Sequence, residues 1–278
     1  MPAKAKIKEM FDGIAADYDK LNHILSLDVD KSWRRRALSV ILNEVKDLSV
    51  LDLACGTGDF AIAIAKASPE AHVTGVDLSE GMLEVMKEKV AKQGLQDRIS
   101  IETGDGENLR FPDGSFDRVT NAFGIRNFED KGKGLKEALR VLKPGGKLVI
   151  LELSRPENKV VRWFYDLYFL NILPKIGGKV SGDKGAYSYL PASVKNFPRK
   201  NEFSAMMRQA GFEAVTHKAF TFGICRMYTG EKPRSAILSL SGIAGWSLRG
   251  TFPSCKCPRS RLRIWMRPWR PFPWRLQG

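Results

Sequence analysis

The sequence predicts an α/β protein with a doubly wound, mostly parallel sheet, and three observations support this. Short apolar runs alternate with helical stretches between about residues 48 and 153. These runs are nearly continuous in apolar residues, as is typical of parallel strands covered on both faces. Two strand-like stretches at residues 213–228 are joined by only a few residues, so they must pair antiparallel. We therefore expect seven strands, one of them antiparallel near the edge of the sheet.

The first half of the sheet follows a simple order along the chain. A predicted strand at Leu48–Leu53 is followed by glycines and a helix at Asp59–Ala67. The next strand, His72–Val76, leads to a helix opening at Ser79, a residue type that commonly caps helix N-termini. The third strand is Ile99–Glu102.

The second half contains four more strands and two more helices. Turn signals rich in Pro and Gly separate several of them. The elements are a strand at Phe116–Ala122 after the turn Pro112-Asp113-Gly114, a helix at Asp130–Leu142 that stops at Lys143-Pro144-Gly145-Gly146, a strand at Lys147–Leu153, a helix ending at Ala210-Gly211-Phe212, and strands at Glu213–Ala219 and Phe222–Tyr228.

Positive charge is concentrated at the C-terminal end of the chain. The 278 residues carry a net charge of +14, but residues 234–278 contribute nine Lys or Arg and no acid, which leaves +5 for residues 1–233. The mildly basic body therefore gives no indication of nucleic-acid binding. We expect a domain at 1–233 and a disordered tail at 234–278, either a cationic Trp-rich membrane segment or an out-of-frame extension.

The sequence also favours a reduced, cytoplasmic protein. Four cysteines are too few for a disulfide framework, and Cys255 and Cys257 lack the partners of a zinc site, so no metal is expected. The basic N-terminus has no apolar core of a signal peptide, and no apolar run is long enough to span a bilayer.

A glycine loop follows the first strand, in the segment LDLACGTGDF at Leu51–Phe60. Gly56 and Gly58 fit the pattern G-x-G-x-x-A, and Asp77 ends a strand 19 residues after Gly58. This pattern is typical of a dinucleotide site, but alone it is weak, and a plain turn between strand and helix is the alternative.

Acidic residues around this loop favour a different ligand. A dinucleotide places its pyrophosphate on such a loop, where Asp52 and Asp59 would repel it. The two carboxylates suit a ligand with a cationic amine and a positive sulfur, and S-adenosylmethionine is such a ligand. We expect Asp77 to accept hydrogen bonds from the ribose hydroxyls; the alternative, a helix cap, is already supplied by Ser79.

The third strand supplies a further contact at Ile101–Gly106. Asp105 is expected to accept from the adenine amino group, with the Gly106 amide beside it, although a solvated loop residue is the alternative. The glycines of the loop, Gly56 and Gly58, let the backbone approach the ligand closely.

These motifs resemble a known enzyme family. LDLACGTGD, GVD, GDGENLRFPDGSFD and RVLKPGG together match the Rossmann-like class I S-adenosylmethionine-dependent methyltransferases. Narrower matches at Met10–Leu38, Phe123–Asp130 and Tyr165–Pro198 resemble the C-methyltransferases of menaquinone and ubiquinone biosynthesis. The resemblance covers about residues 8–232 and places four residues on cofactor-contact positions, namely Thr57, Asp77, Asp105 and Gly106. Ala122 departs from the Ser found in some relatives.

The resemblance implies methyl transfer to a ring carbon of a polyprenylated hydroquinone, with demethylmenaquinol as the expected acceptor. A benzoquinol of ubiquinone biosynthesis, another lipophilic acceptor such as a sterol or phospholipid, and an inactive cofactor-binding scaffold are the alternatives. It also implies a helical lid at 1–45, a substrate-side insertion at 155–198 and transient contact with the inner face of the membrane. Nucleic acid is not an expected partner, and a homodimer stays open.

Candidate catalytic residues follow the fourth strand, at the edge where open α/β sheets bind ligands. Arg126 is expected to stabilise the charge that develops on a ring oxygen, and Asn127 to hold the hydroxyl or a water. The alternative for Arg126 is a structural ion pair with Glu129 or Asp130.

Three further features have competing interpretations. Tyr18 is expected to close over the cofactor, and helix packing is the alternative. His23 is a weaker candidate base, because lone histidines are usually structural. The aromatic stripe Trp163–Leu173 either packs in the core or lines a site for the isoprenoid tail.

Overall fold

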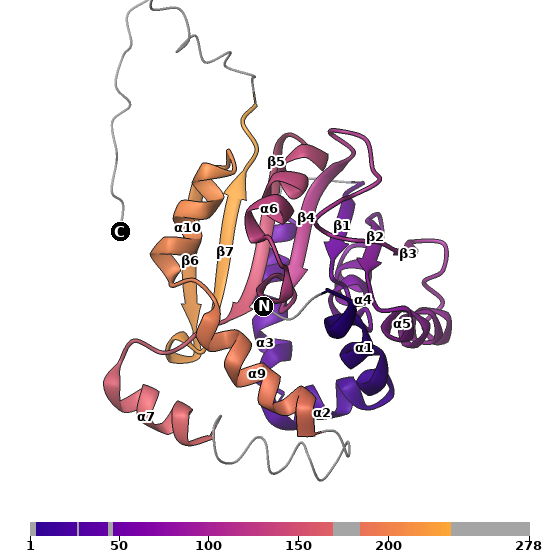
Figure 1. The fold of residues 1–278 in the computed structure, drawn as a ribbon. Coiled ribbons are helices and arrows are strands. Elements are labelled where there is room, and N and C mark those ends of the chain that lie inside the picture. Colours follow the sequence, from indigo (N-terminus) through magenta and orange to yellow (C-terminus); the bar gives the residue numbers. More distant parts are fainter. Residues whose placement is uncertain (1–3, 27, 44–46, 169–183, 235–278) are drawn as a thin grey trace, which may run out of the picture. The chain divides into compact units, whose positions relative to one another are not determined.

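The chain folds around a seven-stranded sheet with the order β3-β2-β1-β4-β5-β7-β6 in this computed structural model (Figure 1). The structure describes residues 4–26, 28–43, 47–168 and 184–234. The strands are β1 (Ser49–Leu53), β2 (His72–Asp77), β3 (Ile99–Thr103), β4 (Phe116–Ala122), β5 (Leu142–Leu153), β6 (Glu213–Phe220) and β7 (Cys225–Glu231). Strands β1 to β5 pair in parallel, whereas β7 is antiparallel to both β5 and β6. The predicted sheet, with one reversed strand near its edge, is confirmed.

Helices cover both faces of the sheet and divide the apolar core in two. One cluster joins α3, α4 and α5 to the sheet, and a second joins α6 and α10 to its other face. In β1, Val50 belongs to the first cluster and Leu51 to the second, as the alternation of side chains along a strand requires. The helices are α1 (Lys4–Ile14), α2 (Tyr18–Ser26), α3 (Val29–Ile41), α4 (Asp59–Ala67), α5 (Glu80–Lys92), α6 (Lys131–Val141), α7 (Lys159–Leu167), α9 (Lys184–Asn196) and α10 (Lys200–Gln209), with short 3-10 turns η1 (Ala15–Asp17), η2 (Ile125–Asn127) and η4 (Thr221–Gly223).

The fifth strand begins earlier than the sequence predicts. The predicted turn at 143–146 is a bulge inside β5, because Leu142 pairs with Phe116 while Lys147 pairs with Arg118. Gly145 takes the positive φ of 77° that this bulge needs, and its amide donates to the Lys232 carbonyl at 2.9 Å. Backbone hydrogen bonds with Lys232, the residue directly after β7, therefore extend β5 through residues 143–146, which look like a helix stop.

The last strand begins later than predicted. Phe222, expected inside it, has φ 55° and is 81% exposed in η4. A bulky residue in this left-handed conformation cannot continue a strand. The strand β7 therefore starts at Cys225.

Two helices that precede the sheet in the chain, and one that lies between β5 and β6, gather at the ends where the parallel strands finish. In Figure 1, α1, α2 and α9 lie beyond these ends, and α1 packs against both α5 and α9. None of the helices in the described part of the chain has the length and apolar character needed to cross a membrane.

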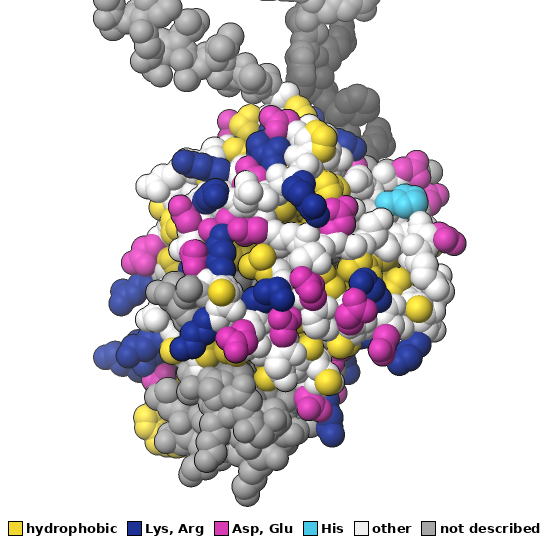
Figure 2. Space-filling view, turned by 45° about the vertical axis from the view of Figure 1, so that its right-hand side comes forward, with side chains coloured by type: hydrophobic (Ala, Val, Ile, Leu, Met, Phe, Trp, Pro, Cys, Tyr) yellow, Lys and Arg dark blue, Asp and Glu magenta, His cyan; other side chains and the backbone are white. Residues whose placement is uncertain are grey.

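The first compact unit of the chain is Met1–Ala236. Most of the predicted tail, from residue 235 onward, lies outside the described residues, as do Cys255 and Cys257. On the face shown in Figure 2, Lys and Arg side chains are interspersed with Asp and Glu.

Candidate active site

Two neighbouring cavities lie at the carboxyl ends of the parallel strands, where open α/β sheets bind ligands. The first, the glycine-loop cavity, has about 1020 Å³ including its mouth and is lined by the ends of β1, β2 and β4 and by α1. The second, the aromatic cavity, has about 1280 Å³ and is lined by α2, α3, α7 and α9. Tyr18, Arg34 and Phe123 line both, so they form the junction between the two cavities.

The glycine loop turns sharply after β1. Ala54, Gly56 and Gly58 have φ values of 50°, 55° and 82°. A Cβ atom on Gly58 would lie 2.5 Å from Cγ of Met86, so only glycine allows α4 to begin this close to α5. The loop geometry therefore depends on both predicted glycines. Gly56 adopts a positive φ, and Gly58 also leaves space for Met86.

Asp52 lies in β1 directly beneath this loop. Its Oδ1 accepts from Thr120 Oγ1 at 2.7 Å, and its Oδ2 is buried with no hydrogen-bond partner among the described residues. Burial is the largest effect on this carboxyl and raises its pKa to about 7. Asp52 is also a lining residue of the glycine-loop cavity, so its carboxylate would attract a cationic group there.

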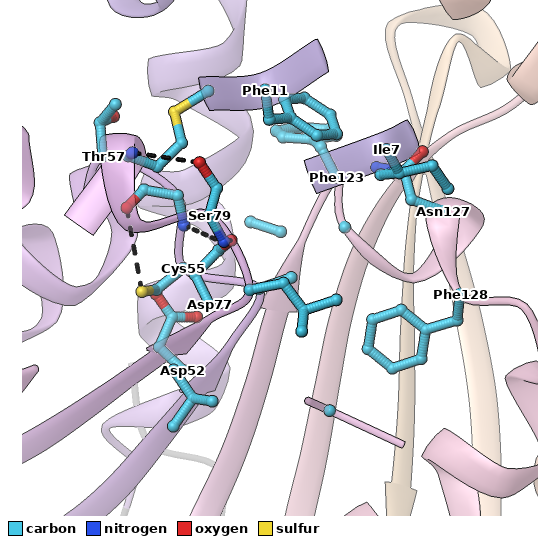
Figure 3. A pocket seen from close by; sticks show the side chains of 18 of the residues that line it. Ile7, Phe11, Asp52, Cys55, Thr57, Asp77, Ser79, Phe123, Asn127 and Phe128 are labelled. Atoms are coloured by element: carbon cyan, nitrogen blue, oxygen red, sulfur yellow. Dashed lines mark hydrogen bonds between the residues drawn. The ribbon is translucent and has the colours of Figure 1, made fainter. Parts of the chain in front are cut away.

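Asp77 closes the other side of the loop (Figure 3). It accepts from the Gly56 amide at 2.8 Å and from the Ser79 amide at 2.9 Å. Ser79, as predicted, caps α5 by accepting from the Met82 amide. Asp77 thus fixes the loop against β2, and it also lines the glycine-loop cavity.

Asp105 and Gly106 lie at the far end of the same cavity. Asp105 accepts from the Glu107 amide at 2.9 Å and forms an ion pair with Lys4 at 2.7 Å. A Cβ on Gly106 would lie 2.6 Å from Cζ of Phe128, so the ring packs directly on the glycine backbone. The predicted contact residues therefore form a wall with a flat apolar surface beside a carboxylate.

Helix α1 completes this cavity, and the sequence did not predict its contacts. Lys4 spans Asp105 and Glu107, and Asp12 accepts from Ser79 Oγ at 2.6 Å. Ile7 and Phe11 add apolar side chains to the cavity wall. The partners of these α1 side chains lie some seventy to a hundred residues away and leave no local signal. The lid expected at residues 1–45 stays a prediction.

Thr57 and Asp59 connect the loop to the charged groups around it. The Thr57 hydroxyl donates to Asp19 of α2, and Lys89 of α5 forms ion pairs with both Asp19 and Asp59 at 2.5 Å. The prediction treated Asp59 as a charge for the ligand. The structure corrects this, because Lys89 already neutralises much of that charge.

The aromatic cavity has mostly apolar walls. Of the predicted stripe, Phe164, Tyr165 and Tyr168 line it, and Trp163 is 61% exposed. Residues 169–173 of the stripe lie outside the described residues. Part of the stripe therefore lines a cavity, although Tyr165 also belongs to a small apolar core cluster.

Arg126 lines the aromatic cavity and is buried. Its Nη1 lies 3.0 Å from Oε1 of Glu152, which is fully buried in β5, and its amide donates to the same carboxylate. The alternative pairing with Glu129 or Asp130 is wrong, because η2 directs the side chain towards β5. The 3-10 turn η2 is held by Asn121, whose Oδ1 accepts from the Ile125 amide at 2.9 Å.

Asn127 does not line the same cavity as its neighbour Arg126, whereas Tyr18 lines both cavities. Asn127 lines the glycine-loop cavity, not the aromatic cavity, and accepts from the Tyr189 hydroxyl at 3.0 Å. Tyr18 lines both cavities and packs edge-on against Phe11. Burial raises the pKa of Tyr18, so its phenol stays protonated at neutral pH. The side chain of His23 lies outside the described residues.

The sequence of the chain matches a known protein family. A model of the ubiE/COQ5 methyltransferase family matches residues 2–232. The chain is 49% identical over 228 residues to the ubiquinone/menaquinone biosynthesis C-methyltransferase UbiE of Geobacter sulfurreducens, which covers 82% of this chain and 88% of that protein. It is 45% identical over 227 residues to the demethylmenaquinone methyltransferase of Bacteroides fragilis, covering 82% and 92%.

Solved structures share the fold at low sequence identity. The [4+2]-cyclase SpnF matches with a TM-score of 0.63 and 16% identity, covering 84% of this chain and 97% of that one. Phosphoethanolamine N-methyltransferase 2 of Haemonchus contortus, solved in complex with S-adenosyl-L-methionine, matches with a TM-score of 0.55 and 17% identity, covering 73% and 52%. At these identities the likeness extends to the fold alone.

Proposed function

Since the chain belongs to the ubiE/COQ5 methyltransferase family, we propose that it transfers a methyl group from S-adenosylmethionine to a ring carbon of a polyprenylated hydroquinone. The observation that carries this proposal is the pair of adjoining cavities. One is bordered by carboxylates and a glycine loop, the other has apolar walls, and they meet at Tyr18, Arg34 and Phe123. A charged cofactor and an apolar acceptor can therefore approach each other at one junction.

The residues of the glycine-loop cavity fit the cofactor. The carboxylate of Asp52, which lines the cavity, suits a cationic group, and the carboxylate of Asp77 can accept hydrogen bonds from ribose hydroxyls. Phe128 against Gly106 provides a flat surface for a purine, beside the carboxylate of Asp105. A Cβ on Gly56 would meet no atom within 4 Å, so the backbone of the loop is open at this residue.

The cofactor supplies a methyl group already activated on a positive sulfur. The protein must then align the acceptor carbon with that methyl and exclude water, and alignment alone can lower a barrier by roughly 7–11 kcal/mol. Phe123 has φ 62° at the junction, a conformation that is costly for a bulky residue. We attribute this backbone strain to the position of the Phe123 ring between the cofactor and the acceptor.

Arg126 supports the electronic part of the reaction. Removing a proton from the ring hydroxyl raises electron density on the neighbouring carbon, and a guanidinium beside that oxygen stabilises the charge that develops. Glu152 holds Arg126 by a 3.0 Å ion pair in a buried setting. The pair fixes the direction of the guanidinium, while its positive charge stays next to the aromatic cavity.

The exposed face of α7 supports contact with a lipid surface. Val160, Trp163 and Phe164 are 65%, 61% and 60% exposed, and Phe164 also lines the aromatic cavity. A nearly insoluble acceptor must be collected from a bilayer, and this helix connects such a surface with the cavity. We propose a peripheral position at the membrane. Replacing Trp163 and Val160 with Ser should weaken binding to vesicles, with activity on a short-chain acceptor retained.

Demethylmenaquinol is the acceptor we propose, and the benzoquinol of ubiquinone biosynthesis is the second candidate, because the relatives carry names for both reactions. The test is methyl transfer from labelled cofactor to a panel of short-chain naphthoquinol, benzoquinol, sterol and phospholipid acceptors. Transfer to a quinol and not to the sterol or phospholipid supports the proposal. Binding of the cofactor with no transfer to any quinol contradicts it and favours a scaffold.

The domain boundary at residue 233 is a separate proposal. The family match ends at residue 232 and the first compact unit at Ala236, which supports a complete domain before the basic tail. A chain truncated after Pro233 should unfold cooperatively and methylate a short-chain acceptor. Loss of cooperative unfolding would show that the tail belongs to the fold.

A further inference from the structure

Arg34 occupies the junction of the two cavities, although sequence patterns did not single it out. It lies on α3 and lines both cavities. Its side chain is only 13% exposed, and its guanidinium lies 5.6 Å from the centre of the Phe123 ring. A cation is therefore held where the cofactor and the acceptor meet.

The guanidinium is only partly used by the protein. Its Nη1 pairs with Asp30 and lies 3.7 Å from Oδ2 of Asp59, the first residue of α4. Its Nε is buried and has no hydrogen-bond partner among the described residues. Buried donors are almost always paired. The guanidinium of Arg34, a residue that lines both cavities, therefore has bonding capacity that the neighbouring acids leave unused.

The positions of the cations around the cavity indicate that Arg34 would bind an anionic group. Within the described chain, the basic residues that line the glycine-loop cavity are Lys4, Lys8 and Arg34. Lys4 is paired with Asp105, and Lys8 with Asp12, at the end covered by α1. Arg34 is the basic lining residue beside the glycine loop.

The amino-acid end of S-adenosylmethionine carries an ammonium and a carboxylate. Asp52 suits the ammonium but repels the carboxylate, which therefore needs a cation close to the loop. The positive charge of Arg34 already acts on this region, since it opposes the rise in the pKa of Asp52 that burial causes.

We infer that Arg34 binds the carboxylate at the amino-acid end of the S-adenosyl ligand through its guanidinium. This inference rests on the proposed cofactor and adds a specificity residue to it. Arg34 should distinguish ligands that carry the carboxylate from those that lack it. The rival role, contact with a ring oxygen of the acceptor from the aromatic cavity, becomes an outcome of the test.

The test is a thermodynamic cycle measured by titration calorimetry on the full chain. The probes are S-adenosylhomocysteine and its decarboxylated form, S-adenosyl-3-thiopropylamine, which keeps the nucleoside, the sulfur and the amine. Wild type should bind the carboxylate form more tightly. Arg34→Met should weaken binding of S-adenosylhomocysteine by about 10- to 150-fold, the range expected for a hydrogen bond to a charged group. It should leave the decarboxylated probe nearly unchanged.

Two further variants separate charge from folding. Arg34→Lys keeps a positive charge beside Asp30 and should restore part of the preference, because it lacks the planar fork. Arg35→Met is the matched control, since Arg35 is the exposed next residue of the same helix and lines neither of the two cavities. It should retain the wild-type preference. Thermal unfolding of each variant verifies that the binding data come from folded protein.

Equal affinity of wild type for the two probes overturns the inference without any variant. An unchanged preference in folded Arg34→Met also overturns it, and a loss of turnover with unchanged preference assigns Arg34 to the acceptor. Failure of the proposed function gives a different result, which is a normal carboxylate preference in a protein that methylates no quinol.

Discussion

Binding of S-adenosylmethionine should release a proton from Asp52. In the free protein, burial raises the pKa of this carboxyl to about 7, so it is largely protonated below neutral pH. Asp52 lines the glycine-loop cavity, where a cationic ligand favours the ionised form of its carboxyl. If the pKa falls well below 5 in the complex, affinity should rise about 15-fold from about pH 5.5 to about pH 7, because the ionised fraction grows by that factor.

Calorimetry in two buffers of different ionisation enthalpy measures this proton directly. Nearly one proton should be released at about pH 5.5 and about half a proton at pH 7. The matched variant is Asp52→Asn, which can still accept from Thr120 but cannot ionise. It should bind more weakly at pH 7 and lose this part of the pH dependence. Affinity that stays flat in wild type, with no proton released, would refute the assignment of Asp52 to the ligand cation.

Asp52→Asn should also change how stability depends on pH. The folded pKa of about 7 lies above the ordinary value of 3.8, so the folded state binds the proton more tightly than the unfolded state. The carboxylate therefore destabilises the wild type progressively between about pH 4 and pH 7, by at most about 4 kcal/mol. The variant lacks this effect and should be relatively more stable above pH 7 in denaturant unfolding.

Three other substitutions test particular contacts. Arg126→Met should lower stability by about 3–5 kcal/mol, because Glu152 stays buried without its partner; adding Glu152→Gln should restore the stability measured in denaturant, while single-turnover methyl transfer stays slow. Gly106→Ala places a Cβ 2.6 Å from the Phe128 ring; we expect a loss of about 1–3 kcal/mol and weaker cofactor binding, and unchanged values would contradict the packing. Lys4→Ala should speed dissociation of S-adenosylhomocysteine in stopped-flow experiments, because α1 loses an ion pair with the cavity wall. An unchanged dissociation rate would show that α1 does not limit release of the ligand.

The parts of the site that the sequence predicted depend on short stretches of chain. Gly58 lies in the loop after β1, and Asp77 is the last residue of β2. Both reach the same edge of the sheet because the carboxyl ends of neighbouring parallel strands lie together. The cap at Ser79 is local in the same way. Periodicity and turn residues were sufficient to place all seven strands, although β5 and β7 start at other residues than expected.

The parts that the sequence did not predict depend on distant partners. Lys4 meets Asp105 across a hundred residues, and Arg126 meets Glu152 instead of the acids three and four residues away. Asn127 follows Arg126 in the chain but lines the other cavity, because η2 turns the two side chains apart. Such pairings arise from the packing of helices on the sheet, which no local pattern records.

The position of the transferred methyl group tests the central claim most directly. Purified protein would be given S-adenosylmethionine labelled with ¹³C in its methyl group and a short-chain demethylmenaquinol, and the product examined by NMR. We predict one labelled methyl group whose carbon is bonded to a ring carbon, with no signal from an aryl ether. Label on a ring oxygen, or no labelled quinol while a different acceptor is methylated, would contradict the account.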